Sequence, residues 1–470
     1  MGDSSLTGWN GEFGSVGQRT RAKPAGEGLA GDDRAPSLLS KDVDRGHSRR
    51  VALGWLCSLQ AGATLVGGAL TFTHHRHDVA ALGGLLQFDT VGVILANILH
   101  VAVLVLAVLI FLSYGGLSSG LAGGVSLLLA IPVYGFLRGV ADGSDPGFRV
   151  HVFAFLYLAT VCLALFALRP TIEDLKVLGG VGVGVALIGL IFAVFYPDTA
   201  YMPKGWNDKL FASFPALAGP VNHSNTLGLF LAFCAPFTLL ISRKWWKWTS
   251  LLLIAGVIVL SQSRTAMLAL GVSLAVFLIC TLWPGTSKVA AGLSLFLAGA
   301  LVVAIPLVNE DPHGFTDRGT VWKWTFEQFH SARDYVWGVS STWPSHPNGW
   351  RHGALLASAH NLFIQWLFVG GVALVILGAL LFLAYTRRVM PMLPGTTPLV
   401  AIMYMLTLLG VSVSEYIVEL APASPFFLVI VVPIVCVLVQ PRPEARQTPE
   451  RMTDHPLTSN TAIAVPAQGR

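Results

Sequence analysis

Three side chains that lie far apart in the sequence combine the residue types that a group transfer needs. Arg264 and His360 each open a long apolar run, and Arg318 lies in the polar stretch between the two runs. Guanidinium groups bind diphosphates through paired, charge-assisted hydrogen bonds. An imidazole can take a proton from a hydroxyl at neutral pH. Together the three residues predict a transfer in which a lipid diphosphate leaves and an alcohol attacks.

Each of these residues also has a purely structural explanation. A histidine at the end of a membrane helix can be a capping or interfacial residue, and Arg318 can form a surface ion pair with its neighbour Asp317. Arg264 is harder to explain in this way, because a cation at the start of an apolar helix is disfavoured by both the lipid and the helix dipole. Anion binding is therefore the favoured interpretation of Arg264.

Four more polar residues are candidates for supporting the same cavity. Asn361 and Gln365 follow His360 at a spacing of four, so in a helix they would share a face. They can line the cavity with His360 or simply join two helices. His223 and Asn225 lie in "NHSNTLG", directly before another apolar run.

The elements that must position these residues are predicted to be membrane helices. Hydrophobic residues make up 54% of the 470-residue chain and charged residues only 12%, about half the charged share of a soluble domain. Apolar windows near the length needed to cross a bilayer recur throughout the chain. We predict an all-α polytopic membrane protein with about twelve transmembrane helices, at residues 51–71, 92–112, 117–137, 151–168, 177–196, 225–242, 248–263, 265–283, 288–307, 359–385, 396–415 and 423–439.

This pattern divides the chain into a membrane body at residues 51–440 and two polar tails, 1–50 and 441–470, which we expect to be disordered and cytoplasmic. The first tail has no apolar segment typical of a signal peptide. All five cysteines fall within predicted helices, which indicates packing rather than disulfides. The net charge of +5 suggests basic flanks on an anionic leaflet, and not nucleic-acid binding.

Lysine and arginine are more frequent on one side of the predicted helices, and this places both termini in the cytoplasm. The long connection 309–358 then faces outward, together with four other polar segments. These are "GPVNHSNTLG" (219–228), "SQSRTAML" (261–268), the start of the last long helix at His360, and "SEYIVEL" (414–420). Glu415 and Glu419 in the last segment can pair with arginines of the same side or be solvated.

Several other chemistries find no support in the sequence. It has no Walker-type loop, GxGxxG or HExxH motif, so nucleotide-driven and zincin chemistry are not indicated. "DGSD" (142–145) lacks histidines at ligand spacing, so we predict no metal site. Five tryptophans of the long connection (322, 324, 337, 343 and 350) are weak evidence for sugar stacking, because tryptophan gathers at membrane interfaces in any case.

The order of these motifs resembles that of the O-antigen ligase and polymerase superfamily. The resemblance is carried by "SQSR" at Arg264, "HNLFIQ" at 360–365, the large connection holding Arg318, and Asn225 in "NHSNTLG". It covers roughly residues 200–390, and the layout of the helices extends it over the membrane body. "WGVSSTWP" (337–344) departs from the glycine-rich stretch often found in this connection, which leaves the acceptor contacts open.

The resemblance implies a C-type glycosyltransferase fold with an outer loop covering the active site. It implies transfer of O-antigen from undecaprenyl diphosphate to lipid A–core at the periplasmic side of a bacterial inner membrane, without a nucleotide or metal cofactor. By the same resemblance, His360 would be the catalytic base, and Arg264 and Arg318 would bind the donor diphosphate. The glycan, the acceptor sugar, the stereochemical outcome and the oligomeric state are left open.

Three alternatives stay open beside the ligase. An O-antigen polymerase uses the same donor but extends another lipid-linked glycan. A protein O-oligosaccharyltransferase often carries a Glu after the His-Asn stretch, where this chain has "WLFVGG". A secondary transporter is the more distant alternative, and we find neither an inverted repeat nor a matching pair of broken helices that would favour it.

Overall fold

The computed structural model describes residues 38–81, 90–114, 122–142, 148–202, 211, 214–221, 223–340, 343, 350–351, 354–355, 358–418, 420 and 424–440. The chain divides into a short N-terminal unit, Met1–Gly46, and a large unit, His47–Arg470. The tails predicted to be disordered lie largely outside the described residues, although the first helix begins at Leu38 rather than near residue 51.

The described residues are almost entirely helical, with one hairpin of two very short antiparallel strands. The α-helices are α1 (Leu38–Ala81), α2 (Thr90–Tyr114), α3 (Ala122–Asp142), α4 (Phe148–Leu168), α5 (Lys176–Phe195), α6 (Pro197–Ala200), α7 (Ser224–Thr238), α8 (Lys244–Ser261), α9 (Arg264–Leu282), α10 (Ser287–Val308), α11 (Gly314–Glu327), α12 (Ala332–Trp337), α13 (Leu362–Val389), α14 (Thr396–Ser412) and α15 (Phe427–Leu438). The hairpin is β1 (Trp350–Arg351) and β2 (Ala354–Leu355), and three short 3-10 helices are η1 (Ile172–Leu175), η2 (Pro284–Thr286) and η3 (Met390–Met392).

Each of the twelve predicted apolar windows falls on one of these helices, so the all-helical membrane prediction is confirmed at this level. Among the described residues, six helical segments are long and apolar enough to cross a membrane, and four further apolar helices are shorter. The count of twelve crossings therefore stays a prediction. The narrow boundary in "SQSR" is real, because α8 ends at Ser261, Gln262 adopts a left-handed conformation with φ 54°, and α9 begins at Arg264.

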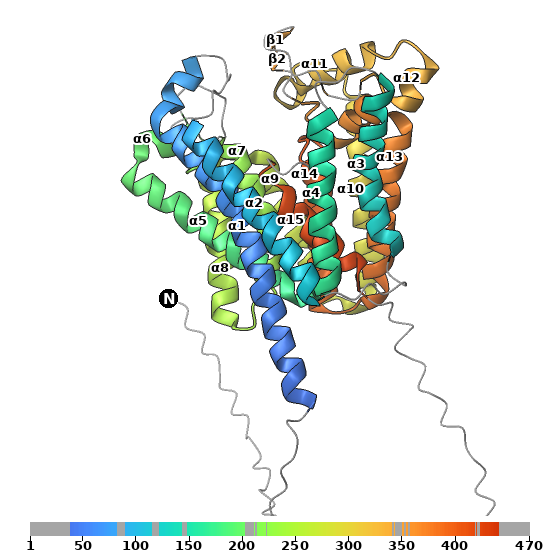
Figure 1. The fold of residues 1–470 in the computed structure, drawn as a ribbon. Helices are drawn as coiled ribbons and strands as arrows, with labels where there is room; N and C mark the ends of the chain where they lie inside the picture. Colours follow the sequence, from blue (N-terminus) through green and yellow to red (C-terminus); the bar gives the residue numbers. More distant parts are fainter. Residues whose placement is uncertain are drawn as a thin grey trace, which may run out of the picture. The chain divides into compact units, whose positions relative to one another are not determined.

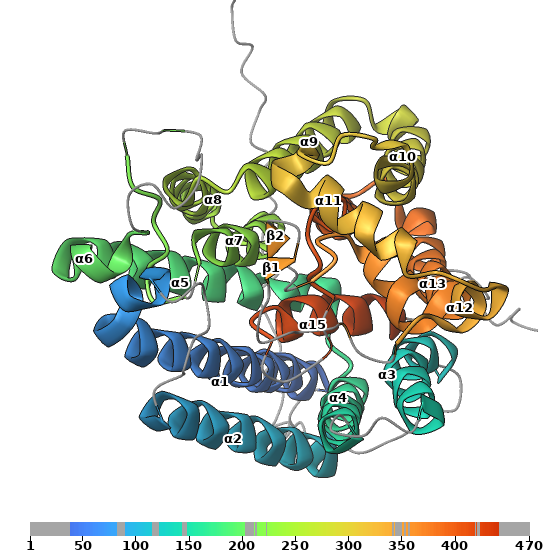
Figure 2. The ribbon, with the colours of Figure 1, turned by 90° about the horizontal axis from the view of Figure 1, so that it is seen from above.

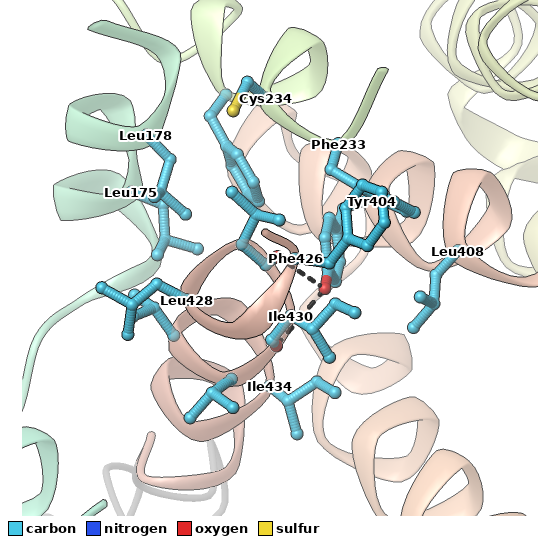
Figure 3. Packing of buried hydrophobic residues seen from close by; sticks show 14 of the residues in the cluster. Leu175, Leu178, Phe233, Cys234, Tyr404, Leu408, Phe426, Leu428, Ile430 and Ile434 are labelled. Carbon is cyan, nitrogen blue, oxygen red and sulfur yellow. Dashed lines mark hydrogen bonds between the residues drawn. The ribbon is translucent and has the colours of Figure 1, made fainter. Parts of the chain in front are cut away.

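The centre of the large unit consists of the shorter helices α7, α14 and α15. Every residue of α15 is buried and almost every residue of α14 and α7, as expected for helices that are hydrophobic on all sides. Tyr404 of α14 lies among the aromatic and aliphatic side chains of this core, and its hydroxyl donates to the carbonyl oxygen of Val429 at 3.0 Å (Figure 3). This bond satisfies the one polar group that Tyr404 brings into the apolar interior.

Longer helices surround this centre and present large apolar side chains outward. Along α2, Val91, Ile98 and Leu112 are 55%, 57% and 70% exposed, and Phe296 of α10 is 71% exposed. Contiguous apolar surface of this extent is typical of contact with lipid rather than with water. The outer faces of the long helices therefore have the composition that a bilayer requires.

Within the large unit, the connection between α10 and α13 lies at one end of the helices (Figure 1). We call this end, at which α7, α9 and α13 begin, the loop end. Seen from above, α11 lies beside α9 and α10, and α12 lies against α13 (Figure 2). The connection thus covers the starts of the helices that carry the predicted site residues.

Helix α13 is bent at Gly371, and the bend anchors α12. Gly371 has φ 63°, and a Cβ atom there would stand 2.2 Å from the carbonyl oxygen of Val336 in α12. Arg138 of α3 donates to the carbonyl oxygens of Trp337 and Gly338 at 2.8 and 2.9 Å. The connection is therefore fixed to the membrane helices α3 and α13 a short distance from His360.

Candidate active site

His360 lies two positions before the first residue of α13, in a backbone conformation that is costly for a non-glycine residue. Its φ is 51°, in the left-handed region. The residues around it hold this conformation in place: the carbonyl oxygen of Ala359 accepts a 2.9 Å bond from the indole nitrogen of Trp322, and the amide of Ala359 donates to Gln365 at 2.8 Å. Strained residues that the surroundings hold fixed are typical of functional sites.

Asn361 is the N-cap of α13 and joins three helices. Its Oδ1 accepts the amide of Ile364 at 2.9 Å, which satisfies one of the unpaired N–H groups of the first turn. Its Nδ2 donates to Val302 in α10 at 3.0 Å and to Val413, just after α14, at 2.9 Å. Asn361 therefore joins neighbouring helices, which was one of the two possibilities that the sequence offered, and Gln365 binds the backbone of Ala359. Both are buried, and both set the position of His360 through backbone contacts.

The side chain of His360 contacts a carboxylate that links it to Arg318. Glu415, three residues beyond the end of α14, accepts from Nδ1 of His360 at 3.3 Å through one oxygen. Its other oxygen accepts a bond from Nη2 of Arg318, in α11. The three side chains are only 26%, 12% and 16% exposed, in the order His360, Glu415, Arg318, so these bonds are largely shielded from water. An ionised carboxylate can only accept, so this contact favours the tautomer of His360 with the ring proton on Nδ1 and a free lone pair on Nε2.

The charge of Glu415 is stabilised by its neighbours. Burial raises the pKa of the Glu415 carboxyl, but the opposing charge of Arg318, the hydrogen bond and charge of His360, and the charge of His223 outweigh it. The pKa of Glu415 therefore lies below its ordinary value, and the side chain is an anion at neutral pH.

Arg264 is the first residue of α9 and reaches across to α11. Its Nη2 lies 3.5 Å from the hydroxyl of Thr316. Thr265, the next residue, shares a 3.0 Å hydrogen bond with Ser414, the residue before Glu415. The start of α9 is thus fixed beside the Glu415 segment, and the positive end of its dipole adds to the charge of Arg264.

The segment of α11 that faces Arg264 has an unusual backbone. Phe315, Thr316 and Asp317 have φ values of 56°, 63° and 62°, three successive residues in the left-handed region. For non-glycine residues this arrangement is costly. The ion pair that the sequence suggested between Arg318 and Asp317 does not form; the carboxylate of Asp317 instead contacts His313 at 2.8 Å, while Arg318 binds Glu415.

The "NHSNTLG" segment contributes the fifth part of the site. His223 is the N-cap of α7, and its Nδ1 accepts the backbone amide of Asn225 at 3.0 Å. Helix α7 begins at the loop end, so His223 lies on the same side of the fold as His360 (Figure 1). Residues from the five predicted polar segments are therefore brought to the loop end, where contacts join four of them directly.

The tryptophans of the connection pack the loop onto the helices. Trp322 is 1% exposed, and Trp324 stacks on Phe368 of α13 with ring centroids 6.1 Å apart. The side chain of Trp350 lies outside the described residues, as does Glu419. Trp322 and Trp324 thus fix the connection to the helices by packing and by the bond of Trp322 to Ala359.

Glu415 is the site residue that sequence reasoning did not place next to the histidine. The sequence offered pairing of Glu415 with an arginine as one of two possibilities, and the structure confirms this pairing. Helix α14 ends at Ser412, and Glu415 lies in the segment that follows it. Among the described residues, no group of three or more His, Cys, Asp and Glu side chains is arranged to hold a metal ion.

Residues 249–377 of the chain match the family model described as O-antigen ligase. The matched segment begins in α8 and ends in α13, so it includes Arg264, Arg318 and His360. No curated protein and no solved structure matches the chain. The resemblance to the O-antigen ligase superfamily is confirmed by this match, while His223 and Glu415 lie outside the matched segment.

Proposed function

From the O-antigen ligase domain at residues 249–377, we propose that this protein is a membrane glycosyltransferase of the O-antigen ligase type. It would transfer an O-antigen glycan from undecaprenyl diphosphate to a sugar hydroxyl of lipid A–core, at the periplasmic side of a bacterial inner membrane. The observation that carries the proposal is the chain of contacts from Arg318 through Glu415 to His360 at the loop end.

In this mechanism His360 is the general base. Nε2 takes the proton from the acceptor hydroxyl, while Nδ1–H stays bonded to Glu415, which stabilises the resulting imidazolium. The acceptor oxygen then forms a bond with the anomeric carbon of the donor glycan as the bond between that carbon and the diphosphate oxygen breaks. The leaving diphosphate carries away the electron pair and stays with its lipid.

Arg264 and Arg318 would bind the diphosphate as its negative charge increases. The contact of Arg318 with Glu415 is made through Nη2, and a guanidinium has five N–H donors in a planar fork. Arg318 can therefore bind a phosphate oxygen while it keeps Glu415 in place. Arg264 lies at the start of α9, where backbone amides and the helix dipole also favour an anion. Four further residues support this arrangement through hydrogen bonds that involve backbone groups: Asn361, Gln365, His223 and Asn225.

An O-antigen polymerase is the second candidate, because it would use the same donor and the same base. A gel of lipopolysaccharide from a strain lacking the gene distinguishes the two. Loss of a ligase leaves unsubstituted core and stranded lipid-linked polymer, whereas loss of a polymerase leaves core capped with one repeat. The strain is then complemented with the wild-type gene or with His360→Gln, which keeps some hydrogen bonding but is not expected to accept the proton.

We expect the wild type to restore the ladder and His360→Gln to leave unsubstituted core at equal protein level, since a general base contributes about 10²–10⁴-fold. Glu327→Gln, at an exposed position of α11, serves as the matched control and should restore the ladder. A normal ladder in the deletion strain would contradict both candidates. A full ladder with His360→Gln would leave the ligase but remove the histidine as its base.

A further inference from the structure

Basic side chains gather at the end of the large unit opposite the loop end, where α4 leads into α5 (Figure 1). Arg169 follows the last residue of α4, and Lys176 is the first residue of α5, with η1 between them. Nη1 of Arg49, in α1, donates to the carbonyl oxygen of Arg169 at 3.5 Å. This contact brings a third basic residue, from a distant part of the chain, to the turn between α4 and α5.

A fourth basic residue lies on the side of α1 that packs against α5. A Cβ atom on Gly54 of α1 would lie 3.7 Å from Val177 of α5, so the two helices are in contact there. Arg50 precedes Gly54 by four residues and therefore shares its face of the helix, while Lys176 directly precedes Val177. We call the four basic residues of this region the α1–α5 basic cluster: Arg49, Arg50, Arg169 and Lys176.

The cluster has more hydrogen-bond donors and more positive charge than its protein neighbours satisfy. Nε of Arg49 is buried and meets no acceptor among the described residues. Within the described part of the chain, Arg49, Arg50 and Lys176 form no ion pair with an acid. The buried carboxylate of Asp174, in η1, instead accepts the amide and the hydroxyl of Thr171, both at 2.8 Å. A buried donor without an acceptor is costly, and a bound anion would satisfy it.

Apolar surface adjoins the cluster on the membrane side. The apolar run of α1 begins at Val51, directly after Arg50, and Val51 and Trp55 are 44% and 61% exposed. On α4, Leu163 is 41% exposed. Tryptophan and aliphatic side chains at the end of a membrane helix are typical of contact with the boundary between headgroups and acyl chains. A ligand that has both a phosphate and acyl chains would contact the basic and the apolar part, whereas a soluble anion would meet only the first.

We infer that the α1–α5 basic cluster binds the headgroup of an anionic phospholipid. Guanidinium groups bind phosphate oxygens in pairs, and basic groups between membrane helices suit headgroups that carry several negative charges. Four cationic residues favour diphosphatidylglycerol, which has two phosphates, over a zwitterionic lipid. The bound lipid would join α1 to the turn between α4 and α5. The inference does not depend on the proposed function, because the cluster lies at the opposite end of the helices from His360.

Arg50→Gln is the most direct test, because it removes a charge of the cluster without breaking an ion pair to any described residue. Arg49→Gln removes the buried donor. Arg243→Gln is the matched control, since Arg243 is an exposed arginine before α8 at the same end of the helices. The full-length protein is purified, stripped of lipid by detergent exchange, and titrated with diphosphatidylglycerol or phosphatidylcholine. Native mass spectrometry gives the apparent Kd of each lipid.

We expect the wild type and Arg243→Gln to bind diphosphatidylglycerol about 10-fold or more tightly than phosphatidylcholine. Arg49→Gln and Arg50→Gln should each weaken the binding of diphosphatidylglycerol about five-fold, the factor expected for one charge near an anionic headgroup. An equal loss in Arg243→Gln would show that any surface charge attracts the lipid, which would overturn the inference. A wild type without preference between the two lipids would overturn it as well.

Thermal unfolding of the same proteins separates the lipid from two simpler explanations. Diphosphatidylglycerol should raise the Tm of the wild type more than that of Arg50→Gln, because a ligand that binds the folded state stabilises it. Inorganic phosphate should leave the Tm unchanged, and an equal rise with phosphate would show that the site takes a soluble anion. If Arg49→Gln lowered the Tm of the lipid-free protein but bound lipid as the wild type does, Arg49 would only cap α4, and the inference would fail.

Discussion

At the scale of single residues, the arrangement of Glu415 decides how His360 can act. The carboxylate fixes the ring through Nδ1 and is itself kept ionised by Arg318. A histidine without such a partner would be free to rotate and would have less stabilisation for its protonated form. Glu415 is therefore a positioning residue in the proposed mechanism, and Arg318 has two tasks, holding Glu415 and binding the donor diphosphate.

Glu415→Gln should reduce glycan transfer by about 10²-fold or more, because the neutral amide cannot stabilise the imidazolium. Donor binding should be retained, since both arginines remain. The carboxylate, whose pKa is lowered in the folded protein, stabilises the fold above the ordinary Glu pKa, and this contribution is lost as the pH falls through the lowered value. The stability difference between wild type and variant should therefore shrink in acid, as measured by thermal unfolding in detergent.

Glu327→Gln, an exposed change on the same helix as Arg318, is the control for Glu415→Gln. If Glu415→Gln kept full transfer activity, the histidine would not depend on the carboxylate. If donor binding were lost together with transfer, Glu415 would act mainly by holding Arg318 in the diphosphate site.

At the scale of elements, the start of α13 is fixed to two other helices by one side chain. Asn361 caps α13 and donates to α10 and to the segment after α14, so the three elements meet next to His360. The same helix is bent at Gly371, where α12 packs closely against it. Helix α13 is therefore fixed at its start by Asn361 and, further along, at Gly371 by the contact with α12.

Asn361→Ala should destabilise the protein by about 1–3 kcal/mol, because a helix cap and two buried hydrogen bonds are lost. Transfer should fall further than the loss of folded protein explains, since His360 would no longer be held in its left-handed conformation. Melting temperature and specific activity of the folded fraction are measured together. Ser331→Ala, which removes the cap of the exposed helix α12, is the matched control and should leave transfer unchanged. Equal effects of the two variants on activity would argue against a positioning role for Asn361.

At the scale of the whole molecule, the chain is suited to a direct test of its orientation. All five cysteines are buried, so the wild type should give little background with a membrane-impermeant maleimide. Asp311 lies in the connection at the loop end, and Gly285 lies in the turn between α9 and α10 at the opposite end; both are exposed. The excess of basic residues predicts that the loop end faces the periplasm.

In intact spheroplasts, we expect Asp311→Cys to be labelled completely and Gly285→Cys to be labelled only after the membrane is opened. A cysteine at position 285 meets no neighbouring atom within 4 Å, so the substitution should not disturb the turn. Labelling of Gly285→Cys in closed spheroplasts, with Asp311→Cys protected, would mean that the protein has the opposite orientation and that the site faces the cytoplasm.

The sequence by itself indicated that this is a membrane protein, where its helices lie, and most of its candidate site. Apolar windows of membrane length located the helices, because in lipid only helices and closed barrels satisfy the backbone. Arg264 and His360 stood out because charged and polar residues at the ends of apolar helices are costly and need a reason, whereas Arg318 was assigned by the family resemblance of its connection. Only the tertiary structure showed that Glu415 joins His360 to Arg318 and that Asn361 and Gln365 hold the backbone. These contacts connect residues distant in the chain and depend on how helices pack, which hydrophobic periodicity does not specify.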